Sequence, residues 1–167
     1  MIVDVITLRD IHMAFDSNLV GEWQHDAKNE QLIFKQDGSS FLGTANIPYT
    51  LSNNSSTLVI NNITTYQRAG NDTGSIVGSW RNESDGEEVT FRSDGRIISI
   101  VDDEDLVGFG YYSVQNSKLT SNDFRSICAT NNNEIEFFPY NAASSTTLTY
   151  AINGQALTIG SETYTKL

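Results

Sequence analysis

The sequence predicts an all-β fold, an antiparallel up-and-down barrel or a set of barrel-like meanders. From Leu19 onward, apolar and polar residues alternate with a period of two, which is typical of strands with one buried face. Asn, Asp and Gly separate the β-rich runs at the places where tight hairpin turns need them. The chain also repeats one unit internally, which indicates that two parts of it share one local structure.

The repeated unit opens with a Gly-x-Trp strand and continues into a hairpin. Its two copies lie 57 residues apart and share these anchors: Val20, Gly21, Trp23, Phe34, Asp37 and Gly38 in the first copy, and Val77, Gly78, Trp80, Phe91, Asp94 and Gly95 in the second. Residues 19–38 align with residues 76–95 without a gap. Each Asp-Gly pair lies between β-rich runs and therefore predicts a tight turn at that place.

A second repeated element predicts a closing hairpin. One copy runs from Tyr49 to Arg68 and the other from Tyr150 to Lys166, and a partial third copy begins at Tyr112. Each starts with a strand and an Asn-centred turn, and the two complete copies end in Tyr-x-Arg or Tyr-x-Lys. Alternate residues of these strands are available to one interior.

These elements divide the chain into an N-terminal extension (1–18), a small β unit (19–69) and a larger β unit (76–167). The spacing of apolar residues in the extension is compatible with a short helix. A polar, Gly-rich linker over 69–74 separates the two tandem units. A unit of about 50 residues buries little apolar surface, so we expect the first unit to pack on the second or to pair strands with it.

The charge of the chain excludes several partners. Lys and Arg number 10 against 21 Asp and Glu, so the net charge is −11. Such a surface repels a phosphate backbone and an anionic membrane, and no nucleic acid is expected as a partner. No stretch contains the roughly 18–20 consecutive apolar residues of a transmembrane helix. Cys128 is the single cysteine, and we expect it to be a small buried hydrophobe rather than a nucleophile.

The sequence predicts no metal, no cofactor and no catalytic residue. The acidic run at 102–105 lacks the alternating spacing of a calcium loop, and a solvated loop explains it better. His12 and His25 have neither a His-x-x-x-His spacing nor a neighbouring Cys that would support a metal site. Gly108 and Gly110 flank Phe109 inside a strand region, where a bulge or close packing is the expected reason for two glycines.

The composition also indicates a compartment. Asn, Ser and Thr are abundant and Lys is scarce, which is more typical of an exported protein than of a cytosolic one. We therefore expect an extracytoplasmic or secreted protein, although the N-terminus shows no basic segment followed by an apolar run, as a signal peptide would.

The doubled Val-Gly-x-Trp pattern, with Phe-x-x-Asp-Gly about eleven residues later, resembles the bacterial lipocalin-like domains of the calycin superfamily. The resemblance implies a barrel in which a basic residue of the last strand packs across the first-strand tryptophan. Arg68 and Lys166 match that role for Trp23 and Trp80. The polar residues with which avidins hold biotin do not map onto this chain, which argues against biotin as the ligand.

An aromatic group in the second unit is the candidate ligand site. Its members are Trp80, Tyr111, Tyr112, Phe137 and Tyr140, and they form either a binding wall or part of the core. The first functional hypothesis is a non-catalytic protein that binds a small apolar ligand in the second unit. The alternative is a surface module with a filled core that binds a protein or glycan partner. A hydrolase that uses acidic residues such as Glu134 and Glu136 is the third hypothesis. The sequence does not indicate an oligomeric state.

Overall fold

The computed structural model describes residues 14–71, 74–100, 107–139 and 143–167. Most of the expected N-terminal extension lies outside these ranges. Its described end contains one 3-10 turn, η1 (Ser17–Leu19), and Asp16 caps that turn by accepting a hydrogen bond from the Asn18 N–H at 2.9 Å. No helix in these ranges has the length and apolar character needed to cross a bilayer.

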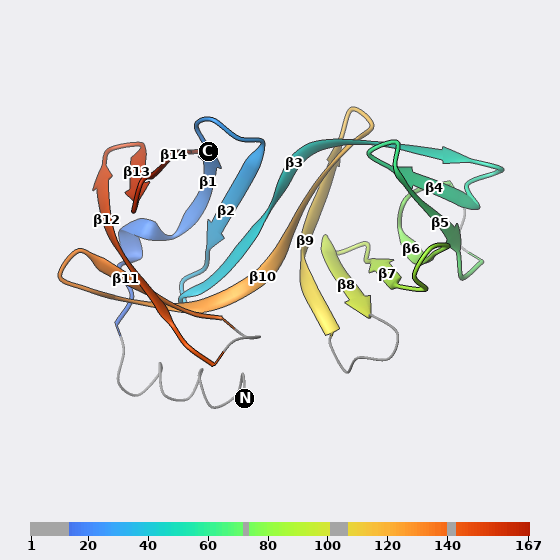
Figure 1. Ribbon diagram of the computed structural model, residues 1–167. Coiled ribbons are helices and arrows are strands. Elements are labelled where there is room, and N and C mark those ends of the chain that lie inside the picture. The colour runs from blue at the N-terminus through green and yellow to red at the C-terminus, as the bar shows by residue number, and fades with distance from the viewer. Residues whose placement is uncertain (1–13, 72–73, 101–106, 140–142) are drawn as a thin grey trace. The chain divides into compact units, whose positions relative to one another are not determined.

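The described residues form fourteen antiparallel strands, so the predicted all-β, antiparallel architecture is confirmed (Figure 1). The strands are β1 (Gly21–His25), β2 (Glu30–Phe34), β3 (Ser39–Ser52), β4 (Thr57–Ile60), β5 (Thr64–Arg68), β6 (Gly78–Asn82), β7 (Glu88–Phe91), β8 (Arg96–Ile100), β9 (Val107–Gln115), β10 (Lys118–Asn131), β11 (Glu134–Pro139), β12 (Thr146–Asn153), β13 (Ala156–Ile159) and β14 (Glu162–Lys166).

Neighbouring strands pair in chain order, and β1 pairs with β14, so the hydrogen-bonded order closes into a ring. The two longest strands, β3 and β10, have 14 residues each and also pair with one another across the ring (Figure 1). That additional pairing divides the ring into two smaller closed circuits that share β3 and β10. One circuit contains β1, β2 and β11 to β14, and the other contains β4 to β9.

The compact units follow these circuits. Unit 1 comprises the described residues up to Gly43 and those from Phe124 onward, and unit 2 comprises Thr44–Asp123. These boundaries differ from the expected tandem units 19–69 and 76–167. The reason is that β5 pairs with β6 across the linker, whereas β14 pairs with β1 at the other end of the chain. Each unit therefore combines the opening hairpin of one sequence copy with the closing hairpin of the other.

The two units use the same strand registers. Equivalent cross-strand pairs are Gly21–Phe34 and Gly78–Phe91, Trp23–Leu32 and Trp80–Val89, Trp23–Lys166 and Trp80–Arg68, and Leu157–Tyr164 and Leu58–Tyr66. In unit 1 the closing strands follow the opening strands along the chain, and in unit 2 they precede them. Unit 2 thus repeats the strand arrangement of unit 1 in circularly permuted chain order.

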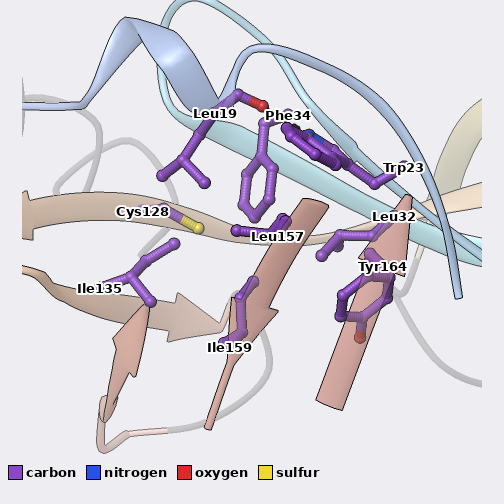
Figure 2. Packing of buried hydrophobic residues seen from close by; sticks show 9 residues of the cluster. All are labelled: Leu19, Trp23, Leu32, Phe34, Cys128, Ile135, Leu157, Ile159 and Tyr164. Carbon is purple, nitrogen blue, oxygen red and sulfur yellow. Dashed lines mark hydrogen bonds between the residues drawn. The ribbon is translucent and has the colours of Figure 1, made fainter. Parts of the chain in front are cut away.

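Each unit has its own hydrophobic core, and each core contains one tryptophan of the repeat. Figure 2 shows the unit 1 core, which consists of Leu19, Trp23, Leu32, Phe34, Cys128, Ile135, Leu157, Ile159 and Tyr164. The unit 2 core consists of Leu58, Ile76, Trp80, Val89, Phe91, Ile97 and Leu119. Both indoles are fully buried, and each Nε1–H donates to a backbone carbonyl four residues earlier at 2.8 Å. The thiol of Cys128 is buried, and its Sγ lies 3.7 Å from Ser126 Oγ.

A basic side chain covers each tryptophan. Lys166 Nζ lies 5.1 Å from the ring centroid of Trp23, and the guanidinium carbon of Arg68 lies 4.1 Å from that of Trp80. Each cation therefore belongs to the tryptophan of the other sequence copy, because strand exchange places β14 beside β1 and β5 beside β6. Gly21 and Gly78, two residues before the tryptophans, both have a positive φ. A Cβ at Gly21 would lie 3.0 Å from Lys166 Cε.

The predicted Asp-Gly turns are present in both copies. Gly38 and Gly95 have φ of 85° and 86°, which a residue with a side chain adopts only with strain. The preceding aspartates accept hydrogen bonds from backbone N–H groups two residues on, Asp37 from Ser39 and Asp94 from Arg96. The turns therefore form for local reasons that the sequence pattern already contains.

Candidate functional site

The four described aromatic residues of the predicted ligand site belong to two different units. Trp80 belongs to the unit 2 core, and Tyr112 packs edge-on against Phe91 with ring centroids 5.0 Å apart. Tyr111 is half-buried on the opposite face of β9 from Tyr112. Phe137 lies in unit 1, and Tyr140 lies outside the described residues.

Phe137 is, however, part of the wall of a mainly apolar cavity. This cavity lies in unit 1 and has a volume of about 210 Å³. Its apolar wall consists of one residue from each of five strands: Leu32, Leu42, Phe137, Leu148 and Ile159. Its polar lining consists of Glu30, Ser40, Arg125, Ser126, Glu162 and Tyr164. An apolar wall with a few polar groups is the usual lining of a small-molecule site.

Two buried serines form the uncharged, hydrogen-bonded part of this polar lining. Ser40 and Ser126 are 1% and 3% exposed, and their hydroxyl oxygens lie 2.7 Å apart. Ser40 Oγ also lies 3.2 Å from the backbone carbonyl of Ser126, which accepts its hydrogen bond. A small side chain at each of these two positions leaves space that a larger one would fill. The pairing of β3 with β10 brings these residues together, although they are 86 positions apart in the chain.

Tyr164 belongs both to the unit 1 core and to the lining of the cavity. Its ring is buried and belongs to the unit 1 core, as Figure 2 shows. Burial raises the pKa of its hydroxyl to about 12, and the nearby carboxylates of Glu30 and Glu162 contribute to that rise. The hydroxyl is therefore protonated at neutral pH, and it faces a negative potential.

His25 holds one of these carboxylates in place. The side chain is 5% exposed, and Nδ1 accepts hydrogen bonds from the N–H groups of Ala27 at 3.0 Å and Lys28 at 3.1 Å. Because Nδ1 is an acceptor, these bonds assign the ring proton to Nε2, which donates to Glu162 Oε2 at 2.5 Å. Lys28 Nζ lies 3.2 Å from the other oxygen of Glu162. These hydrogen bonds, from His25 first and Lys28 second, lower the pKa of Glu162.

This role of His25 was not predicted, because the residues next to it in the sequence form no recognisable binding motif. A usable signal was present in the repeat. Asn82 stands at the equivalent position of unit 2, and its Oδ1 accepts from the Ser84 N–H at 2.8 Å. Histidine and asparagine both offer an acceptor to the turn after the Gly-x-Trp strand, and histidine adds a donor that reaches Glu162.

Two further hollows in unit 1 are larger and mainly polar. One has a volume of about 460 Å³ and includes Glu134 and Glu136, and the other has a volume of about 520 Å³ and includes Asp16, Tyr150 and Lys166. Glu136 accepts a hydrogen bond from Ser145 Oγ at 2.6 Å, so its carboxylate already has a partner. No group of three or more potential metal ligands occurs among the residues that the structure describes.

Comparison with known proteins gives no further assignment, because no family model, no curated protein sequence and no solved structure matches the chain. The geometry of the unit 1 cavity is therefore the basis of the functional argument.

Proposed function

We propose that this chain is a non-catalytic, lipocalin-like binding protein whose unit 1 cavity takes a small, mainly apolar ligand. The cavity of about 210 Å³, with five apolar residues in its wall, carries the proposal. An apolar cavity of about 150 Å³ is large enough to hold benzene, so a ligand of roughly six to ten non-hydrogen atoms matches this one. The proposal includes the extracytoplasmic location that the composition favours.

The position of the cavity differs from the site expected in residues 76–167 as a tandem unit. Its lining comes from both ends of the chain, from Glu30 to Leu42 and from Arg125 to Tyr164. A ligand in this cavity would contact seven strands of unit 1, namely β2, β3 and β10 to β14, so its binding would also stabilise the pairing between distant parts of the sequence.

Titration with toluene, followed by methyl chemical shifts, tests the proposal. We expect saturable shifts of the Leu148 and Ile159 methyl groups, because toluene matches the cavity in size and polarity. Leu148 is 39% exposed, so Leu148→Trp can place an indole across the cavity with little damage to the core. This variant should abolish the saturable shifts. Thr149→Trp, on the neighbouring exposed position of the same strand, is the matched control and should retain them.

Absence of saturable binding in the native chain would overturn the proposal. Equal loss of binding in Leu148→Trp and Thr149→Trp would also contradict it, since only the first substitution reaches the cavity. Circular dichroism and thermal melting of both variants would establish that each is folded.

A surface-binding role is the second candidate, and one observation in unit 2 favours it. Ile100 and Phe109 are 47% and 43% exposed and come from the paired strands β8 and β9. Exposed apolar side chains on adjacent strands are common at protein interaction surfaces. Substitution of both residues by serine should leave toluene binding unchanged if unit 1 holds the ligand.

A further inference from the structure

We infer that the ligand of the unit 1 cavity carries a cationic amine, which binds beside Glu30 while its apolar part lies against Phe137 and Ile159. This inference rests on the proposed function and specifies the chemical class of the ligand. It follows from the charges of the polar residues that line the cavity.

The two carboxylates of the lining differ in their partners. Glu162 accepts hydrogen bonds from His25 and Lys28 and is thereby satisfied. Glu30 is half-buried, and its carboxylate makes no hydrogen bond or ion pair with another residue in the described part of the chain. A half-buried carboxylate at the edge of an apolar cavity attracts a cation more strongly than an exposed one, because less water screens the interaction.

The electrostatic environment of Tyr164 also favours a cationic ligand. Burial and the charges of Glu30 and Glu162 raise its pKa to about 12, which indicates a negative potential at the hydroxyl. A ligand carboxylate beside Glu30 would face a like charge, whereas an ammonium group would face an opposite one. The protonated tyrosine can also accept one hydrogen bond from an ammonium group.

Arg125 is the one basic residue in the lining, and its position limits its influence. The side chain is exposed, while its strand neighbours Phe124 and Ser126 are 6% and 3% exposed. Its charge therefore lies toward solvent, where water and salt screen it. It is not among the groups that shift the pKa of Tyr164.

The second copy of the fold supplies a matched control. Glu30 stands two residues before Leu32, which pairs with Trp23, and Glu87 stands two residues before Val89, which pairs with Trp80. Glu87 also raises the pKa of Tyr66, the tyrosine equivalent to Tyr164. Glu87 is thus the same residue type in the same register, but in the unit that does not contain this cavity.

Calorimetric titration of the full chain with benzylamine, benzyl alcohol and benzoate near neutral pH tests the inference. The three probes share one ring and differ in head-group charge. We expect benzylamine to bind most tightly, benzyl alcohol about tenfold more weakly, and benzoate most weakly. Glu30→Gln should weaken benzylamine about tenfold and leave benzyl alcohol within about twofold, and Glu87→Gln should change neither.

The outcomes separate this inference from the proposed function. Benzoate binding as tightly as benzylamine, or benzylamine binding that Glu30→Gln does not weaken, would overturn the amine assignment while leaving the cavity as a ligand site. Failure of all three probes and of toluene would overturn the proposed function, and the inference with it. Retained binding of benzyl alcohol by Glu30→Gln would show that this variant is folded around an intact cavity.

Discussion

The guanidinium of Arg68 lies over the indole of Trp80, 4.1 Å from its centroid, although the two residues belong to different copies of the sequence repeat. Arg68 also donates hydrogen bonds to the carbonyls of Ser55, Val77 and Ser75 at 2.7, 2.9 and 2.6 Å. Lys166 takes the equivalent place over Trp23 at 5.1 Å. The two contacts close two units that each draw on both copies of the repeat.

Removal of the basic side chain that covers the tryptophan should destabilise unit 2 more than unit 1. Arg68→Met loses the contact with Trp80 and leaves three carbonyls without their donor, for an expected cost of about 2–4 kcal/mol. Lys166→Met loses mainly the contact with Trp23, for about 0.5–1 kcal/mol. Urea unfolding followed by tryptophan fluorescence measures both changes. Equal costs for the two substitutions would contradict the assigned contacts.

The strand exchange predicts which fragment folds. Residues 44–123 contain the whole of unit 2, and the two ends of this fragment belong to β3 and β10, which pair with each other. We expect this fragment to show a β-type circular dichroism spectrum and a cooperative thermal transition. Fragments 19–69 and 76–167 should show neither property. The first contains β1 and β5 without their partners β14 and β6, and the second contains β6 and β14 without their partners β5 and β1. A cooperative transition in fragment 76–167 alone would argue against the exchanged arrangement.

The two glycines that flank Phe109 should differ sharply in their tolerance of alanine. A Cβ at Gly110 would lie 1.8 Å from the backbone oxygen of Asn122, so Gly110→Ala must force β9 and β10 apart. We expect a loss of about 3 kcal/mol or more. A Cβ at Gly108 would lie 2.5 Å from Ser99 Oγ, a side-chain atom that can rotate away, so its cost should stay near about 1 kcal/mol.

Chemical denaturation of the two alanine variants measures the difference. The double variant Gly108→Ala with Ser99→Ala removes the side chain in question and should recover most of the stability lost by Gly108→Ala. A Gly110→Ala protein as stable as the native chain would contradict the close strand approach at this position.

The folded chain should lose stability in alkaline solution. The pKa values of Tyr66 and Tyr164 are raised to about 12, first by burial and then by nearby carboxylates. A raised folded pKa means that the folded state holds the proton more tightly, so this stabilisation is complete below the ordinary tyrosine pKa of about 10 and is lost as the pH rises toward 12. The pKa values of Tyr112 and Tyr150 are also raised, in the same direction.

Thermal melting between about pH 8 and pH 12, with tyrosinate absorbance recorded in parallel, checks this expectation. The double variant Tyr66→Phe with Tyr164→Phe should lose less stability over this range than the native chain, since both perturbed hydroxyls are gone. An identical pH dependence in the two proteins would show that these tyrosines do not carry the effect.

Several parts of the fold were predictable because neighbouring residues encode them. The alternation around Trp23 and Trp80 predicts strands, and the Asp-Gly pairs predict the turns at Gly38 and Gly95 that the structure contains. Few residues of the candidate site could be predicted in this way. Among the described members of the predicted aromatic group, Phe137 is the one that lines the cavity. Ser40, Ser126 and His25 acquire their roles from residues far away in the chain.

Local sequence encodes the strands, their turns and the two equivalent Gly-x-Trp units, because these depend on residues within a few positions of each other. The placement of Lys166 over Trp23 and of Arg68 over Trp80 arises from tertiary packing. The two copies offer closely similar strand edges, so local sequence does not distinguish one partner from the other. The pairing of β3 with β10 also joins distant segments, and it places Ser40 beside Ser126 in the wall of the cavity. Such contacts between distant segments are not encoded by residues that are neighbours in the sequence.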